Sequence, residues 1–258
     1  MAIKEAALAL LSAVFIDYDA DAATKLLAPD YIQHNPNLPT GAAAITGAIP
    51  ALEEAGLTVE THRIFAEGDF VVMHNTYTNA EFFGAPTLVA VDVLRMEDGV
   101  FVEHWDNLQI PPEVTASGRS MTDGPTEITD LDKTADNKAV VEGFVNDIFL
   151  GGKLDKAADY IISEPGAYAQ HNPLVPDGLE SLDFAFKNIF GADPTFTIHT
   201  LHLIVAEGNF VFTATEGVLG GEPTAFFDIW RLEGGKIVEH WDVIESIPGE
   251  MAHDNGKF

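Results

Sequence analysis

The pentapeptide Val102-Glu-His-Trp-Asp106 occurs a second time in the chain as Val238-Glu-His-Trp-Asp242. Two further motifs recur in the same order. Tyr31-Ile-Gln-His-Asn-Pro36 recurs as Tyr168-Ala-Gln-His-Asn-Pro173. His62-Arg-Ile-Phe-Ala-Glu-Gly68 recurs as His202-Leu-Ile-Val-Ala-Glu-Gly208. Three ordered matches with nearly constant spacing are the signature of an internal repeat. The sequence therefore predicts two tandem copies of one small domain.

The length of 258 residues also fits two domains of ordinary size. Between the copies, residues 111–134 are rich in Pro, Ser, Thr, Gly and Asp and show no periodicity, which is typical of a linker. We place the first domain at 1–118, the linker at 119–134 and the second domain at 135–258.

Each copy begins with helical periodicity and continues with strands. The helical stripes consist of Ile3, Ala7, Leu10, Leu11, Val14 and Phe15 in the first copy, and of Val141, Phe144, Val145, Ile148 and Phe149 in the second. Runs rich in β-forming residues start at Thr58 and at Thr195, and turn sequences interrupt them. This order predicts an α+β fold in which helices cover one face of a curved antiparallel sheet.

The composition restricts the partners of the protein. There is no Cys, so a Cys nucleophile and thiolate metal sites are excluded. The formal net charge of −28 repels phosphate backbones and anionic lipid headgroups, so we expect neither nucleic acid nor a membrane as a partner. The apolar run near the start has helical spacing, unlike a signal peptide, and no stretch is long enough to span a membrane. We expect a cytoplasmic protein.

Alternation along the last strand of each copy places His104 and Asp106 on one face with Val102, and Trp105 on the other face with Phe101. The position of Asp92 on the preceding strand depends on the turn between them. A two-residue Asp-Gly turn would set Asp92 opposite Trp105, whereas a three-residue loop would pair Met96 with Val100 and set Asp92 opposite His104. We favour the second register because it leaves Arg95 near Glu103 on the wet face.

One face of each copy then carries two carboxyl groups and an imidazole among apolar side chains. These are Asp92, His104 and Asp106 in the first copy, and Asp228, His240 and Asp242 in the second. Burying such groups is costly unless they are paired, which favours a functional role over a structural one. Desolvation raises the pKa of a carboxyl group toward the range useful for proton transfer near neutral pH.

Other polar and aromatic residues join the candidate site. His34 and His171 lie before a proline that restricts the backbone. Substrate-binding candidates are His74, whose counterpart is Ala214, together with Asn35, Asn172 and Trp230. We interpret His62 and His202 as structural, and we expect Trp105 and Trp241 to pack at a domain or subunit interface.

The motifs Tyr-x-Gln-His-Asn-Pro and Val-Glu-His-Trp-Asp resemble the SnoaL-like polyketide cyclases of the nuclear-transport-factor-two-like superfamily. The resemblance implies two cone-shaped domains, each with helices on a strongly bent antiparallel sheet around a central pocket. It also implies that Asp106 and Asp242 act as general acid/base without metal or cofactor. Asp92 and Asp228 depart from the family, which often has His at this position.

The first functional hypothesis is a cofactor-independent acid/base enzyme, of aldol cyclase, isomerase or dehydratase type, acting on a small carbonyl compound. Asp106 or Asp242 would move the proton, Asp92 or Asp228 would orient the neighbouring imidazole, and His34 or His171 would donate to the developing enolate oxygen.

The alternatives are a non-catalytic small-molecule carrier and a metal enzyme that uses His34, His74, Asp92 and His104. For assembly we expect a monomer in which the two sheets pair as an intrachain pseudo-dimer.

Overall fold

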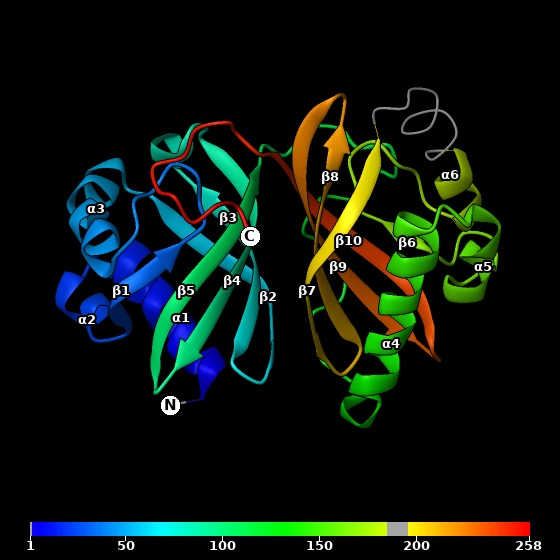
Figure 1. Ribbon diagram of the computed structural model, residues 1–258, viewed down its shortest axis with the longest axis horizontal. Helices are drawn as coiled ribbons and strands as arrows, with labels where there is room; N and C mark the ends of the chain where they lie inside the picture. The colour runs from blue at the N-terminus through cyan, green and yellow to red at the C-terminus, as the bar shows by residue number, and fades with distance from the viewer. Residues whose placement is uncertain (1, 185–195) are drawn as a thin grey trace. The chain divides into compact units, whose positions relative to one another are not determined.

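A computed structural model describes residues 2–184 and 196–258, and its chain divides into two compact units (Figure 1). The first unit consists of residues 1–110 together with 248–258, and the second consists of residues 111–247. The chain thus leaves the first unit after its last strand and returns to it at the end. Each unit is described by itself below.

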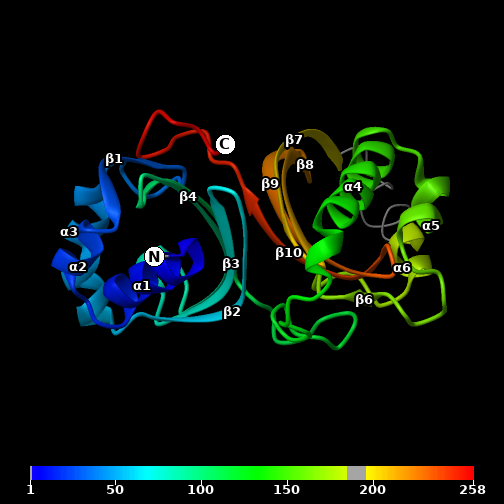
Figure 2. The same cartoon turned by 90° about the horizontal axis from the view of Figure 1, so that it is seen from below.

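The first unit contains three helices, five strands and one short 3₁₀ helix. In chain order they are α1 (Ile3–Phe15), α2 (Ala20–Thr24), β1 (Leu27–Gln33), α3 (Ala42–Ala55), β2 (Thr58–Glu67), β3 (Phe70–Thr78), η1 (Glu81–Phe83), β4 (Thr87–Glu97) and β5 (Val100–Gln109). The helices lie together on one side of the sheet (Figure 2). The helix predicted from the first apolar stripe is confirmed as α1.

Among its described residues, the second unit repeats this order of helices and strands, without a counterpart of η1 between β8 and β9. It contains η2 (Leu131–Lys133), α4 (Thr134–Phe144), the π-helical turn η3 (Val145–Leu150), η4 (Leu154–Lys156), α5 (Ala157–Tyr160), β6 (Ala169–Gln170), α6 (Leu179–Phe184), β7 (Thr197–Glu207), β8 (Phe210–Leu219), β9 (Glu222–Glu233) and β10 (Lys236–Ser246). The predicted strand start at Thr195 lies outside the described residues, and β7 begins at Thr197.

The two sheets have the same topology, with strand orders β1-β5-β4-β3-β2 and β6-β10-β9-β8-β7. The four long strands of each sheet form an antiparallel meander, while β1 runs parallel to β5 and β6 runs parallel to β10. The predicted antiparallel sheet is therefore mixed at one edge. The parallel strand matters for the site because it carries the Gln-His-Asn-Pro motif to the side of the His-Trp-Asp strand.

Apolar side chains from the helices and from one face of the sheet form the core of each unit. In the first unit Leu10 and Val14 of α1 and Leu52 of α3 pack over Met73 and Leu94 of the sheet. In the second unit Phe144 of α4 packs with Trp230 and Ile237. The α+β arrangement predicted from the sequence, with helices covering one face of the sheet, is confirmed in each unit.

The register of the β4–β5 hairpin differs from the prediction. Glu97 pairs with Val100 across a two-residue turn, whose residues Asp98 and Gly99 have φ of 49° and 86°. A β-bulge at Val102 then shifts the register, so Arg95 pairs with Glu103 and Asp92 with Asp106. Asp92 does share the face of His104, but it lies opposite Asp106 rather than opposite His104.

The same bulge corrects the faces of two predicted residues. Phe101 was expected beside Trp105 on the outer face, but it is fully buried in the core because the extra residue reverses the alternation. Val102, expected beside His104, is the unpaired residue of the bulge and is half-buried. The second hairpin has its bulge at Val238, and Ile237 is buried in the core there.

The residues predicted as a linker, 119–134, belong to the second compact unit, where they include η2 and the start of α4. Residues 248–258, which the sequence placed in the second domain at 135–258, belong to the first compact unit. None of the described helices is long and apolar enough to cross a membrane.

Candidate active site

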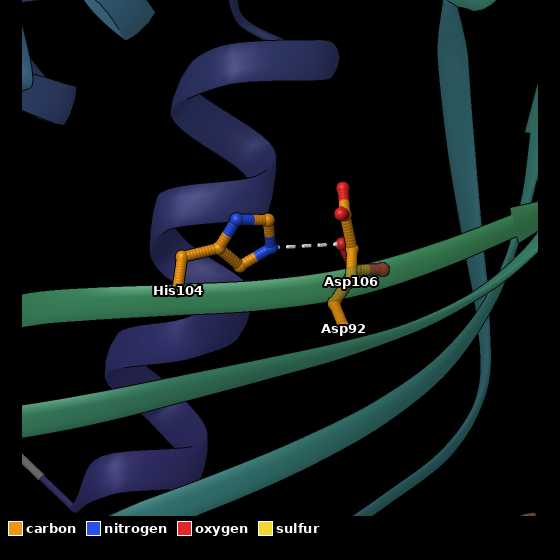
Figure 3. A group of neighbouring side chains, drawn as sticks. All are labelled: Asp92, His104 and Asp106. Carbon is orange, nitrogen blue, oxygen red and sulfur yellow. Dashed lines mark hydrogen bonds and ion pairs between the residues drawn. The ribbon is translucent and has the colours of Figure 1, made fainter. Parts of the chain in front are cut away.

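In the first unit Asp92, His104 and Asp106 extend from the neighbouring strands β4 and β5 toward the helices (Figure 3). Nε2 of His104 lies 3.1 Å from Oδ1 of Asp92. The two aspartates are each 4 % exposed. Two carboxyl groups and an imidazole thus share one buried corner of the sheet, as the sequence predicted.

Gln33, at the end of the parallel strand β1, fixes Nδ1 of His104 as a hydrogen-bond donor. Its Oε1 lies 2.9 Å from Nδ1 of His104, and it also accepts the backbone N–H groups of His34 and Asn35. A carbonyl oxygen only accepts, so Nδ1 of His104 is a donor. Nε2 is left to interact with Asp92.

The charges around His104 favour its protonated form. Burial alone would lower the pKa of His104, but the hydrogen bond to Asp92 and the negative charges of Asp106 and Asp92 outweigh burial and raise the pKa above its ordinary value. An imidazolium that donates to both Gln33 and Asp92 satisfies all of these contacts.

Two donors hold the other oxygen of Asp92. Nδ2 of Asn75 lies 2.7 Å from Oδ2 of Asp92, and the hydroxyl of Tyr77 lies 3.1 Å from the same oxygen. Both donors come from β3, where they face the same side as Asp92. With His104 on Oδ1, Asp92 is fully engaged inside the protein.

Asp106 differs from Asp92 because one of its oxygens is unengaged. Oδ2 accepts a hydrogen bond from Nδ2 of Asn35 over 2.7 Å. Oδ1 is buried and has no hydrogen-bond partner among the described residues. A buried polar atom without a partner is rare in folded proteins, and it indicates a place where a ligand or water completes the site.

Asp106 lines a cavity of about 80 Å³ that opens between the sheet and the helices. Most of the wall is apolar and comes from α1, α3 and η1, including Leu10, Phe15 and Phe83. The polar end is formed by Tyr31, Gln33, Asp92, His104 and Asp106. A mostly apolar pocket with a few convergent polar groups is the usual form of a small-molecule site.

Tyr31 is the second group of this pocket with hydrogen-bonding capacity to spare. Its hydroxyl makes no hydrogen bond to the described residues, and its ring stacks on His104 with centroids 6.4 Å apart. Burial and the negative charges of Asp106 and Asp92 raise the pKa of Tyr31 well above its ordinary value. The hydroxyl therefore stays protonated and can donate.

The second unit repeats the core of this arrangement. Nε2 of His240 lies 2.9 Å from Oδ1 of Asp228, Nδ1 of His240 lies 2.9 Å from Oε1 of Gln170, and Oδ2 of Asp242 accepts from Asn172 over 2.6 Å. Oδ1 of Asp242 has no partner among the described residues, like that of Asp106. The two sites therefore share their hydrogen-bond plan.

The surroundings of the second site are bulkier and less polar. Its cavity measures about 50 Å³, and Trp230 and Phe226 line it where the first unit has Leu94 and Ala90. The indole of Trp230 stacks on His240 with ring centroids 4.1 Å apart, and its Nε1 donates to Thr213. Trp230 lines the second pocket, as predicted.

Asp228 also lacks the donors that hold Asp92. The ladder places Thr215 where Asn75 lies and Gly217 where Tyr77 lies. A Cβ at Gly217 would lie 1.9 Å from the carbonyl oxygen of Thr197, so no side chain fits there. Burial raises the pKa of Asp242 to about 6, and the charge of Asp228 adds to this effect while His240 opposes it.

The structure does not bring His34 and His171 into the pockets. Nε2 of His34 lies 3.0 Å from Glu103 on the outer face of the sheet, and its ring stacks on Trp105 with centroids 5.0 Å apart. His171 stacks in the same way on Trp241 and contacts Glu239. The prediction that His34 and His171 donate to an enolate oxygen is therefore wrong. Their Glu and Trp partners lie on the outer face of the sheet and hold both imidazole rings there, away from the pocket.

His74 lies outside the pocket as well. It is on the outer face of β3, where its Nδ1 lies 3.2 Å from Arg63, and its ring approaches His62. His62 and His202 contact Thr76 and Glu216, respectively, and neither lines a pocket. The predicted ligand set of His34, His74, Asp92 and His104 is therefore not assembled.

A different group could be considered for a metal ion. Among the described residues, Asp92, His104 and Asp106 bring one ligand atom each within 4.8 Å of one another, and so do Asp228, His240 and Asp242. Both ring nitrogens of His104 are already hydrogen-bonded, so a metal would have to displace the contact with Asp92. The group fits proton transfer better than metal binding.

Sequence reasoning missed four residues of the first site, namely Tyr31, Gln33, Asn75 and Tyr77. Tyr31 and Gln33 stand in a motif that recurs as Tyr168 and Gln170, and this recurrence was the available signal. Asn75 and Tyr77 have no counterpart of the same type in the second copy, so only the sheet register reveals them.

Residues 8–104 match the SnoaL-like domain family. The matched stretch begins in α1 and ends at His104, so it contains Asp92 and the first Gln-His-Asn-Pro motif. No curated protein matches the chain.

Solved structures similar to this chain include three proteins of related description. One is IdmH, a putative polyketide cyclase from Streptomyces antibioticus (22 % identity, 41 % of this chain and 90 % of that chain, TM-score 0.34). Another is a putative polyketide cyclase from Bacillus cereus (17 % identity, 40 % of this chain and 72 % of that chain, TM-score 0.35). The third is an LEH-like epoxide hydrolase from M. tuberculosis (20 % identity, 41 % of this chain and 81 % of that chain, TM-score 0.35).

Proposed function

We propose that the protein is an acid/base enzyme that needs no cofactor and that moves a proton on a carbon next to a carbonyl group. The observation that carries the proposal is Oδ1 of Asp106, a buried carboxylate oxygen at the pocket with no partner among the described residues. Such an atom is placed to accept a proton from a bound molecule. The match to the SnoaL-like domain and the description of two similar structures as putative polyketide cyclases agree with this chemistry.

Each polar residue of the pocket has a separate role in this proposal. Asp106 takes the proton from carbon, and Asn35 fixes its carboxylate through Oδ2. Tyr31 donates a hydrogen bond from its hydroxyl to the carbonyl oxygen as negative charge develops there. His104, held by Gln33 and Asp92, supplies positive charge beside the forming enolate. Tyr31 thus takes the role that the sequence analysis gave to His34.

The apolar wall restricts the substrate to a small, mostly apolar carbonyl compound. The polar atoms lie at one end, so the carbonyl group would point toward the sheet and the apolar part toward α1 and α3. The same enolate chemistry serves an aldol cyclisation, an isomerisation or a dehydration.

Exchange of hydrogen for deuterium tests the proposal without knowledge of the true substrate. The full chain is incubated in D₂O with a panel of small ketones, and deuterium at the α-carbon is measured by mass spectrometry. We expect exchange with the unmodified protein and a loss of about 10² to 10⁴-fold in Asp106→Asn, since this is the usual contribution of a general base. Asp30→Asn, which alters an exposed residue of β1, is the matched control.

Two outcomes would replace the proposal. Binding of ketones without any exchange would make the protein a carrier. Stoichiometric metal in protein purified without a His-tag, found by elemental analysis and lost in Asp92→Asn, would favour a metal enzyme built on the group that contains Asp106.

A further inference from the structure

Residues 248–258 pass beside the Gln-His-Asn-Pro motif of the first unit and make several hydrogen bonds with it. The backbone N–H of Ala252 donates to the carbonyl oxygen of Pro36 over 2.8 Å, and Nδ1 of His34 lies 2.9 Å from the carbonyl oxygen of Gly256. Nδ2 of Asn255 donates to the carbonyl oxygen of Gln33. This segment therefore fixes the motif that holds His104 and Asp106.

The second unit has an equivalent segment, and it comes from the chain that follows β5. The backbone N–H of Ala116 donates to Pro173 over 2.9 Å, and Nδ1 of His171 lies 2.7 Å from the carbonyl oxygen of Ser120. Ala116 corresponds to Ala252 and Ser120 to Gly256, with the spacing that separates the two His-Trp-Asp motifs. Each unit is completed by the segment that follows the last strand of the other.

The next residue differs between the two segments. Lys257 follows Gly256, and Met121 follows Ser120. Both side chains are buried, with 3 % exposure each. Nζ of Lys257 donates to the backbone carbonyl oxygen of Asp106 over 2.7 Å. A lysine is almost never fully buried without a specific partner, so its place beside the active-site strand calls for a reason.

We propose that Lys257 is a positioning residue of the first site, which anchors Asp106 and supplies a positive charge that the second site lacks because Met121 takes its place. The proposal rests on the proposed function, since it concerns how Asp106 acts. The first site then has two cations beside its two carboxylates, namely His104 at the pocket and Lys257 on the backbone carbonyl of Asp106. The second has only the imidazole of His240.

Among the residues that the structure describes, the charged and titratable groups around Asp106 can be named. They are His104 on its own strand, Asp92 on β4, Tyr77 on β3, Tyr31 on β1 and Lys257 from the last segment, while α1, α3 and η1 contribute only apolar side chains to the pocket. Lys257 lowers the pKa of His104, against the effect of the two aspartates.

Exchange of the two residues tests the proposal in the full-length protein. Met already occupies the matching buried position in the second unit, so Lys257→Met is expected to fold. We expect the pKa of His104, followed by NMR of its ring nuclei, to rise in Lys257→Met, because a nearby cation is removed. The acid limb of the deuterium-exchange profile is expected to move to higher pH. Lys25→Met, which removes an exposed charge of the same unit, is expected to change neither.

The reciprocal variant gives an independent measurement. Met121→Lys is expected to lower the pKa of Asp242 below its value of about 6. If Lys257→Met folds and the pKa of His104 is unchanged, the proposal is overturned. If Lys257→Met does not fold, an unchanged pKa of Asp242 in Met121→Lys overturns it. Absence of exchange in the unmodified protein would contradict the proposed function alone, because both NMR readouts are independent of catalysis.

Discussion

Gln33 fixes Nδ1 of His104 as a hydrogen-bond donor, because its Oε1 lies 2.9 Å from Nδ1 and already accepts two backbone N–H groups. The first prediction concerns this contact. Gln33→Glu keeps the acceptor and adds a negative charge, so the pKa of His104 is expected to rise further above its ordinary value. NMR titration of the histidine rings measures the change. Gln170→Glu, the same change in the second unit, is expected to leave His104 unaffected.

Tyr31 provides the second prediction. Its hydroxyl is the donor to the carbonyl oxygen in the proposed reaction, and removal of one such donor costs about 10² to 10³-fold in kcat. Tyr31→Phe is therefore expected to slow deuterium exchange by this factor with little change in KM. Tyr18→Phe, which removes a hydroxyl bonded to the carbonyl of Leu57, is the matched control. Equal exchange rates in Tyr31→Phe and the unmodified protein would contradict the role of Tyr31.

The sequence alone indicated the fold and the buried groups of the site. Strand alternation and the repeat placed Asp92, His104 and Asp106 together, because these features depend on neighbouring residues along two adjacent strands. The register was wrong because a bulge at Val102 leaves no sequence signal of its own. His34 was placed on the wrong side because its direction depends on Glu103 and Trp105, across the sheet.

Lys257 illustrates a different limit. It lies more than a hundred positions from Asp106 along the chain, in a segment that sequence analysis assigned to the second domain. Local patterns describe which residues form an element, but they do not say to which unit a non-periodic segment returns. The hydrogen bonds of Ala252, Asn255 and Gly256 reveal the unit to which this segment returns.

The raised pKa of Asp242 gives a prediction about stability. The folded value is about 6 and the ordinary value is 3.8, so the folded state holds an extra proton between these pH values. The free energy of unfolding therefore falls as the pH rises from about 4 to about 6, by about 3 kcal/mol in total for this group. Asp242→Asn is expected to remove this fall and to be more stable than the unmodified protein at pH 7.5. Urea unfolding at pH 4 and pH 7.5 measures it, with Asp30→Asn as the control.

The oligomeric state provides a fourth prediction. A fused chain supplies two copies of the same outer surface, and the tether holds them at about millimolar effective concentration, so pairing within the chain outcompetes pairing between chains. We expect light scattering to give a mass near 27.8 kDa. A mass of twice this value at micromolar concentration would instead support a dimer of whole chains.

The bulge at Val102 provides the last prediction. Deletion of Val102 removes the extra residue, and one end of β5 must then change the face to which its side chains point. The stretch Glu103–Gln109 pairs with β4 along its length and with β1 at its start, whereas only Val100 and Phe101 lie between the bulge and the turn. The short end is therefore expected to change its face, so that Phe101 leaves the core while His104 and Asp106 keep their places.

The free energy of unfolding should fall by about 3–5 kcal/mol, as for Phe101→Ala, because both changes remove the same buried ring. The NMR titration of His104 should stay as it is in the unmodified protein. If the deletion abolishes the raised pKa of His104 but leaves stability intact, the bulge sets the register of the catalytic end instead.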